Sequence, residues 1–346
     1  MSSQFTATLP SEQTALAELL QSTFPASGEV NSFVPDVLRW KYFSPHPDWS
    51  GPRSYVVKKD GGIVGHGGIW PLRLAKGNIQ LSAIHLIDWA ARRSASGVGV
   101  LLLRKLADLA DLLLTIGGSD DTQRILPRLG YQQAGELKMQ AKVVRPWLQY
   151  RTTSEPGWRA PARLLRNTIW SLPLLPPVPK GWQAARIPRF DSSVEPLLCS
   201  QRETLTPLRT VAGLNRILDC PAATFQAFLV YEGSRLQGYF VLSLVAGQTR
   251  IADLRLATDN PQSLKTVCVL AAKTAAAIPE TCEVVAGFSA NAVQAAFEES
   301  GFRPRQTLPI YYYDPRKLLK GVPLLDLSLL DGDGCFLANL KHPFLT

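Results

Sequence analysis

The chain has 346 residues, a net charge of +9 from 37 basic and 28 acidic side chains, and 46% hydrophobic residues. This length predicts two domains, and the hydrophobic content is sufficient for a core in each, which argues against disorder. The positive charge favours an anionic ligand, but no basic block with interleaved aromatic residues occurs, so we expect no nucleic-acid partner.

The cysteines and histidines argue against a metal site. All five cysteines lie in the second half, without a CxxC pair, and only four histidines are present: the cysteines are Cys199, Cys220, Cys268, Cys282 and Cys335. This pattern also argues against a disulfide framework and is typical of a reducing compartment. The N-terminal residues show no signal peptide and charges interrupt every long apolar run, so we expect a cytoplasmic protein without a metal.

Periodicity and turn residues predict the elements of the first half. The first are a helix over 11–22 with a capping box at Ser11–Thr14, a short helix over Val37–Trp40, a hairpin around Asp60-Gly61-Gly62 and a strand in IQLSAIHLIDWAAR. They are followed by a glycine loop SASGVG (Ser94–Gly99), a helix from about Gly99 to Asp111, a buried strand in LLLTIGG, a helix capped by Ser119 and closed by Gly130, and a final strand or pair of strands over Tyr131–Val144.

Residues 151–182 are rich in Pro, Arg and Trp and predict a linker around one short basic amphipathic helix. One interpretation is a connector that packs across both domains. The other is a contact with a membrane surface, because Arg163 and Arg166 alternate with Leu164, Leu165, Ile169 and Trp170.

From about residue 183 the same order of elements recurs. The predicted elements are a helix in SSVEPLLCSQRETL, a hairpin around Glu232-Gly233, a strand in TRIADLRLATD, a helix entered through Asn260 and Pro261, a strand in CEVVAGFS, a helix in SANAVQAAFEESGF and a strand in RQTLPIYYYD. We therefore predict an internal duplication, with domains 1–150 and 183–346 joined by the linker 151–182.

The order and the motifs together resemble the GCN5-related N-acetyltransferase (GNAT) superfamily in a tandem arrangement. VLRWKYFSPHP (Val37–Pro47) is similar to the helix-end motif of a bacterial branch, VVKKDGGIVG to the central hairpin, and SASGVG stands in the place of the acyl-CoA pyrophosphate loop. LLTIGGSDDTQRILPRLGYQQAGEL and VVAGFSANAVQAAFEESGFRP are similar to the late strand, helix and GF/GY turn. The resemblance implies a mixed α/β (α+β-like) fold, with a mostly antiparallel sheet flanked by helices in each half.

The resemblance also implies an enzyme that transfers an acyl group, from acetyl-CoA or another acyl-CoA, directly to the amine of a small molecule, with an amino sugar as one candidate. One alternative is a non-catalytic binding or scaffold protein of GNAT fold. It is favoured by Leu126 and Phe297, which occupy the two positions where many family members have a tyrosine that acts as general acid. Neither side chain can donate a proton. Another alternative is an aminoacyl or peptidyl transferase of the cell-wall type.

Amides at a helix N-terminus attract anions, and glycines allow their close approach. The predicted cofactor-binding residues are Trp89, Ala91, Arg93, Ser94, Ser96, Gly97, Val98, Gly99 and Val100. Ser94 departs from the Gln or Arg that usually opens this loop. The second half lacks this glycine loop, since ATDNPQSL follows Leu256, so we expect it to bind no CoA or to bind it poorly.

Three side chains are catalytic candidates. Asp88 precedes the glycine loop and either takes the amine proton, orients the acceptor, or is a buried structural carboxylate, since Asp253 repeats it in the second half. His66, on the adjacent hairpin strand, is either a base candidate, because the unperturbed pKa of histidine lies near neutrality, or a structural residue. On a regular strand the side chains of His85 and Asp88 would point to opposite faces of the sheet, so they can form a pair only if a bulge intervenes.

Asp331 and Asp333 lie near the C-terminus in the glycine-containing stretch LSLLDGDGCFL. The further ligands of a calcium loop are missing. The stretch therefore predicts either a simple turn or a site whose carboxylates bind the acceptor.

Overall fold

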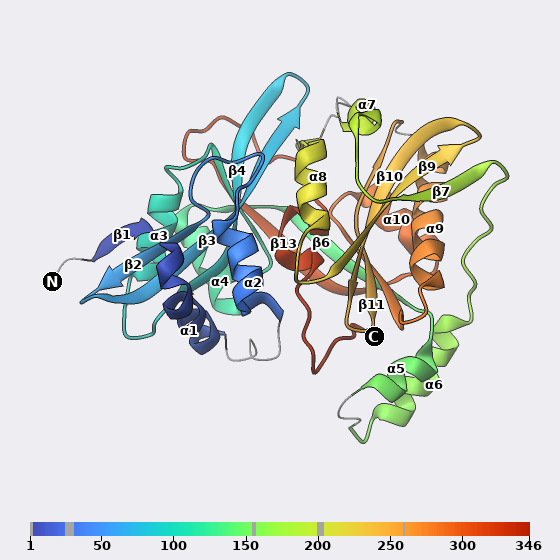
Figure 1. The fold of residues 1–346 in the computed structure, drawn as a ribbon, viewed down its shortest axis with the longest axis horizontal. Coiled ribbons are helices and arrows are strands. Elements are labelled where there is room, and N and C mark those ends of the chain that lie inside the picture. Colours follow the sequence, from blue (N-terminus) through green and yellow to red (C-terminus); the bar gives the residue numbers. More distant parts are fainter. Residues whose placement is uncertain (1–2, 25–30, 154–156, 199–203, 259) are drawn as a thin grey trace.

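A computed structural model describes residues 3–24, 31–153, 157–198, 204–258 and 260–346 (Figure 1). The first half contains β1 (Gln4–Ala7), η1 (Pro10–Glu12), α1 (Gln13–Thr23), η3 (Asn31–Phe33), α2 (Pro35–Leu38), the π-helix η4 (Arg39–Phe43), β2 (Ser54–Lys59), β3 (Gly62–Lys76), β4 (Ile79–Ala91), α3 (Val98–Leu106), β5 (Leu112–Ile116), α4 (Asp120–Ile125), η5 (Pro127–Leu129) and β6 (Gln132–Val143).

Two helices, α5 (Pro146–Thr152) and α6 (Ala160–Ser171), lead to the second half. It contains β7 (Trp182–Ile187), η6 (Ser192–Val194), α7 (Glu195–Leu198), β8 (Thr206–Pro207), α8 (Val211–Leu218), β9 (Thr224–Glu232), β10 (Arg235–Val245), β11 (Gln248–Leu256), α9 (Pro261–Ala277), β12 (Glu283–Phe288), α10 (Asn291–Glu299), β13 (Arg303–Tyr313), η7 (Leu329–Asp331) and η8 (Asp333–Cys335).

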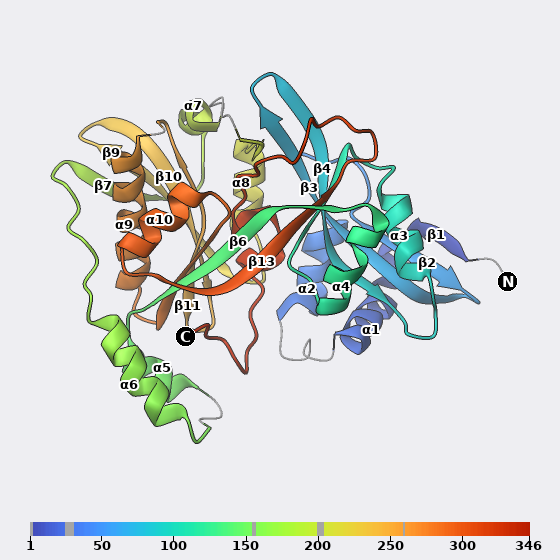
Figure 2. The same cartoon turned by 180° about the vertical axis from the view of Figure 1, so that it is seen from behind.

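The two halves share one sheet of 13 described strands, in which the last strands of the halves are exchanged. The order is β1-β2-β3-β4-β5-β13-β6-β12-β11-β10-β9-β7, with β8 paired to β3. β13 from the end of the chain thus lies between β5 and β6, and β6 pairs with β12 (Figure 2). The predicted mixed α/β class is confirmed, although the sheets of the two halves are continuous rather than separate.

Two strand pairs are parallel, β4 with β5 and β11 with β12, and the other pairs are antiparallel. The β4–β5 pairing ends at His85–Leu114, although β4 continues to Ala91. The two strands therefore separate beyond His85, and the edges of their backbones face a gap. β11 and β12 separate in the same way beyond Ile251.

Local chemistry explains why several predicted elements form. In the first hairpin, Asp60 and Gly61 have φ of 53° and 81°, the left-handed pair that a two-residue turn requires. The Ser119 hydroxyl accepts from the Thr122 amide and starts α4.

The described chain contains no helix of the length and apolar character needed to cross a bilayer.

Other elements differ from the prediction. The capping box at Ser11 does not form, because Glu12 accepts from the Leu9 amide and α1 begins at Gln13. The helix after the glycine loop ends at Leu106 rather than Asp111, whose carboxylate instead binds the Ser82 amide and hydroxyl. The predicted helix in SSVEPLLCSQRETL continues beyond Leu198 into residues, Cys199 included, that lie outside the described ranges. Periodicity did not indicate β7, α5 or α8.

The segment that follows β13 returns to the junction of the halves. Leu327, Leu329, Leu330 and Phe336 of this segment are buried in the largest apolar cluster, which draws on both halves. An extended Gly332 passes so close to β4 that a Cβ there would lie 2.6 Å from the His85 ring. The loop with Asp331 and Asp333 is therefore part of the interior.

Candidate functional site

A cavity of about 890 Å³ opens where β4 and β5 separate. It is lined by the end of β4, the N-terminal turn of α3, the loop after β5, Phe24 and Phe33 beyond α1, and the C-terminal loop. Its walls are mainly apolar, with polar side chains from β4, from the start of α4 and from the C-terminal loop. Thr115, 5% exposed, lines the cavity, and its buried hydroxyl has no hydrogen-bond partner in the described chain.

The glycine loop forms one end of the cavity. Gly97 has a φ of 79° and precedes α3 without a side-chain cap, and the described chain offers no acceptor for the amides of Gly99 and Val100. In the second half, by contrast, the Asn260 side chain accepts from the amides of Gln262 and Ser263. The α3 N-terminus is thus open to an external anion, whereas that of α9 is already capped.

The nine predicted cofactor residues are distributed along this end. Trp89, Ala91, Arg93 and Gly99 line the cavity, and the indole of Trp89 donates to the Gly99 carbonyl at 3.2 Å. Ser94, Ser96 and Gly97 are exposed on the loop, Val98 is buried in the core, and Val100 is half-buried.

Asp88 lies on a β-bulge of β4, within the stretch that lines the cavity. β3 pairs Gly68 with Ile87 and His66 with Ala90, so two residues of β4 face Gly67 alone. Asp88 adopts a φ of 48°, a left-handed conformation that is rare outside glycine. The bulge brings His85 and Asp88 to the same cavity.

Asp88 belongs to a buried ionic cluster. The Lys41 ammonium, 0% exposed, lies 2.6 Å from Asp88 Oδ2 and 3.0 Å from Asp333 Oδ2. The Tyr42 hydroxyl also donates to Asp88 Oδ2. Both Lys41 and Tyr42 come from the π-helix η4, which turns consecutive side chains toward the bulge. The cluster places two carboxylates at the cavity around one cation.

Burial alone would raise the pKa of Asp88, but the charge of Lys41 and hydrogen bonds from Lys41 and Tyr42 outweigh it and lower that pKa. Burial likewise opposes the ammonium of Lys41, but the two carboxylates outweigh it and raise its pKa. Lys41 and Asp88 are therefore ionised at neutral pH, and Asp88 is a weak proton acceptor.

Asp331 and Asp333 lie close in sequence but belong to different clusters. Asp331 is 0% exposed and accepts from Arg209, which also binds Asp253 at 3.1 Å and 3.2 Å. Asp333 lines the cavity, and its Oδ1 has no partner in the described chain. Arg209–Asp253–Asp331 thus repeats in the second half the pattern of Lys41–Asp88–Asp333.

Both candidate histidines have two occupied ring nitrogens. His66 is fully buried between the Asp88 carbonyl, at 2.8 Å from Nδ1, and the Ser54 hydroxyl, at 2.9 Å from Nε2, and it does not line the cavity. His85 lines the cavity, with Nδ1 2.9 Å from the Asp331 carbonyl and Nε2 accepting from the Ile116 amide. Burial lowers the pKa of both, that of His66 to about 4, so both rings are neutral.

Sequence reasoning missed Lys41 and Tyr42 as site residues. Both stand within the quoted VLRWKYFSPHP stretch, but Lys41 meets Asp88 47 positions away and Asp333 292 positions away. Within the described residues, no group of three His, Cys, Asp or Glu side chains could hold a metal ion. The described cysteines, Cys220, Cys268, Cys282 and Cys335, are free and buried.

No family model matches the sequence. No curated protein matches it either. The structure, however, resembles several solved ones. A GCN5-related N-acetyltransferase from Anabaena variabilis superposes with a TM-score of 0.60 at 13% identity, covering 90% of this chain and 73% of its own. A tandem GNAT protein from the clavulanic acid biosynthesis pathway gives 0.55 at 13% identity, covering 90% and 98%.

Saccharomyces cerevisiae N-myristoyltransferase with bound myristoyl-CoA gives a TM-score of 0.58 at 13% identity, covering 90% of this chain and 83% of its own. At these identities the likeness concerns the fold. Since both halves are covered, the chain has the fold of the GCN5-related N-acetyltransferases in their tandem arrangement.

Proposed function

We propose that this protein is an acyl-CoA-dependent N-acyltransferase that works in the cavity between β4 and β5. The observation that carries the proposal is that one cavity joins the uncapped N-terminus of α3 to a carboxylate with an unoccupied oxygen, Asp333. The first feature suits an anionic cofactor and the second suits an amine.

The loop end fits the pyrophosphate of CoA. The amides of Gly99 and Val100 point to no protein acceptor, and Arg93 adds a positive charge at the cavity wall. The separated edge of β4 is suited to bind the polar groups of an extended cofactor arm. When bound, acyl-CoA supplies the acyl group as a thioester.

The other end fits the acceptor amine. Asp333 Oδ1 would accept a hydrogen bond from the amine and take its proton as the new C–N bond forms and the C–S bond of the thioester breaks. The departing CoA thiolate takes a proton from solvent and leaves as free CoA thiol. Lys41 holds the Asp333 carboxylate through the other oxygen. Asp88, whose pKa is lowered, orients the acceptor rather than accepting the proton. His66 acts behind Asp88 by binding its carbonyl.

We propose acetyl-CoA as the donor and the amine of a small molecule, such as an amino sugar, as the acceptor. The solved structures of the same fold include enzymes named for acetyl and for myristoyl transfer, so donors of both lengths belong in the test.

The test measures the melting temperature with and without CoA, acetyl-CoA and myristoyl-CoA, since a ligand that binds only the folded state raises it. Gly97→Glu should abolish the rise, because it places an anion beside the pyrophosphate. Gly61→Glu is the matched control: both glycines have a left-handed φ, 79° and 81°, and open space around a Cβ. Absence of any rise at millimolar CoA contradicts the proposal.

Transfer is measured as release of free CoA thiol with a panel of amines. Asp333→Asn should retain the CoA-induced rise and lose about 10²- to 10⁴-fold in rate. A rise with CoA but no transfer to any amine would instead support the binding or scaffold alternative.

A further inference from the structure

The α5–α6 hairpin has no part in the proposed reaction, yet it is held firmly. It projects from one edge of the molecule, away from the sheet (Figure 1). On its inner face, Asn167 donates to Gln149 at 2.9 Å, and Gln149 donates to the Thr346 hydroxyl at 2.8 Å. The guanidinium groups of Arg303 and Arg305 cover the Trp170 ring. The outer face of α6 therefore has a fixed orientation.

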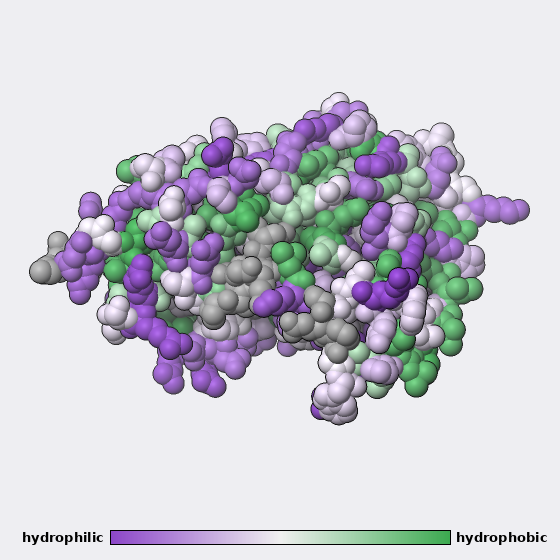
Figure 3. Space-filling model, turned by 60° about the horizontal axis from the view of Figure 1, so that its bottom comes forward, coloured by the Kyte–Doolittle hydropathy of each residue, from purple (hydrophilic) through white to green (hydrophobic). Residues whose placement is uncertain are grey.

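This outer face is unusually apolar. Thirteen large hydrophobic side chains are exposed in the described chain, and six of them lie between positions 147 and 174: Trp147, Trp158, Leu165, Ile169, Leu172 and Leu174. Leu165, Ile169 and Leu172 follow one another at helical spacing and are 65%, 56% and 68% exposed. In Figure 3 the hydrophobic colour gathers toward the lower right, the side on which the hairpin lies in Figure 1.

The described charges of the hairpin have one sign. Arg151, Arg159, Arg163 and Arg166 lie on the hairpin, and no described residue between positions 146 and 174 is acidic. None of these four arginines forms a salt bridge with a carboxylate of the described chain. Arg163 lines a cavity with Asn167 and Arg166 stacks on Trp170, so these arginines flank the stripe rather than lie on it. Arginines without a carboxylate partner in the described chain, on the same hairpin as exposed Leu, Ile and Trp side chains, match the interface of an anionic membrane.

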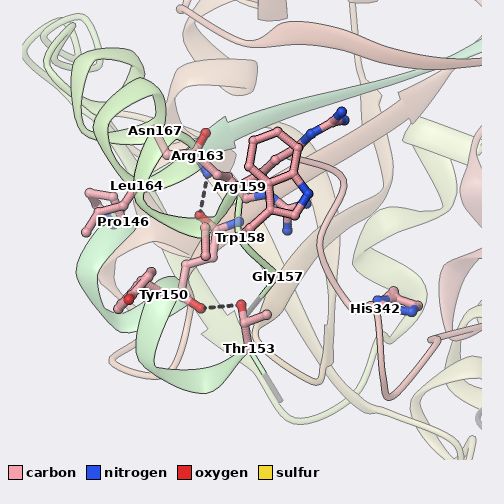
Figure 4. Close-up of a pocket in the computed structure, with 12 residues that line it drawn as sticks. Pro146, Tyr150, Thr153, Gly157, Trp158, Arg159, Arg163, Leu164, Asn167 and His342 are labelled. Carbon is pink, nitrogen blue, oxygen red and sulfur yellow. Dashed lines mark hydrogen bonds between the residues drawn. The ribbon is translucent and has the colours of Figure 1, made fainter. Parts of the chain in front are cut away.

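A cavity of about 330 Å³ between α5 and α6 adds to this match (Figure 4). Its lining includes the two exposed arginines Arg159 and Arg163, together with Tyr150, Trp158 and His342. Trp158 is 85% exposed, and the Arg159 guanidinium stacks on its ring at 4.7 Å. Tryptophan and tyrosine side chains are enriched at the headgroup level of a bilayer, where arginine can also contact lipid phosphates.

We propose that the α5–α6 hairpin binds the surface of an anionic membrane, with the stripe Leu165, Ile169 and Leu172 entering the headgroup boundary and the arginines contacting lipid phosphates. A second copy of the chain fits this face less well, because its own arginines would approach those of the first. The proposal is independent of the reaction in the β4–β5 cavity.

The experiment is co-sedimentation of the full chain with vesicles of phosphatidylcholine alone or with 30% phosphatidylglycerol. We expect binding to the anionic vesicles, weaker binding to the neutral ones, and loss of binding as salt is raised. Arg159→Glu combined with Arg163→Glu should lower the partition coefficient at least about tenfold, because each basic residue at an anionic surface contributes substantially. Leu165→Ser combined with Ile169→Ser should lower it to a similar extent.

Two controls separate the hairpin from the rest of the surface. Lys59→Glu with Lys76→Glu makes the same charge change at exposed sites of two other hairpins, β2–β3 and β3–β4, and Val322→Ser removes an apolar side chain that is 58% exposed elsewhere. Both should bind as the parent does. Equal binding by the hairpin variants, or no binding to anionic vesicles at low salt, overturns the proposal. A dimer in solution that Leu165→Ser with Ile169→Ser converts to monomer would overturn it in favour of a self-association face.

Discussion

Replacing Lys41 by Met would test whether the buried cluster depends on its single cation. Methionine fills a similar volume but leaves the Asp88 and Asp333 carboxylates facing each other without a countercharge. In the native chain, the ammonium is 0% exposed, and it lies 2.6 Å and 3.0 Å from oxygens of side chains that are only 8% and 12% exposed.

At an effective dielectric constant of 20, contacts of this length correspond to roughly 6 kcal/mol of attraction each, most of which desolvation offsets. Removing one partner of a buried ion pair destabilises a protein by about 3–5 kcal/mol, because an uncompensated charge remains. Here two carboxylates remain, so we expect a loss at the upper end of that range at pH 7.

The assay is urea unfolding of the parent and Lys41→Met at pH 7 and pH 4. The deficit should shrink at the lower pH: without Lys41 the facing carboxylates repel, their pKa values rise, and protonation relieves the repulsion. Lys58→Met is the matched control, because Lys58 pairs with Glu12 at 2.5 Å with its side chain 23% exposed, and such pairs contribute at most about 1 kcal/mol. A loss below about 1 kcal/mol for Lys41→Met would refute the reasoning.

Three further outcomes are expected. Gly332→Ala should destabilise the fold by about 1–3 kcal/mol in urea unfolding, because its Cβ would lie 2.6 Å from the His85 ring; unchanged stability would mean that this loop shifts freely. Arg209→Met should cost about 3–5 kcal/mol, because it leaves the buried Asp253 and Asp331 carboxylates without the cation that bridges them; a neutral effect would show that this cluster does not depend on its cation. The pKa of His66 is about 6.5 in the unfolded chain, whereas burial lowers it to about 4 in the folded chain. As the pH falls through this interval, only the unfolded chain gains the proton, so the free energy of unfolding should decrease by about 3 kcal/mol for this group. His66→Gln should flatten that pH dependence, and an unaltered slope would assign it elsewhere.

Local rules were sufficient for most elements near the site. The Asp60-Gly61 turn, the Ser119 cap and the Asn260 cap each follow from residues within a few positions of one another. The glycine loop before α3 was also recognisable, because a left-handed residue and an uncapped helix start are properties of short stretches of chain. The resemblance to the GNAT fold rested on the order of such elements.

Contacts between distant residues could not be predicted in this way. Pairing of Lys41 with Asp333, the exchange of β6 and β13, and the division of Asp331 and Asp333 between two clusters depend on how the halves pack. The sequence by itself determined the repeated elements and the open helix N-terminus. Only the tertiary structure decided which carboxylate faces the cavity, because burial and charge pairing are properties of the packed chain, set by segments nearly 300 residues apart.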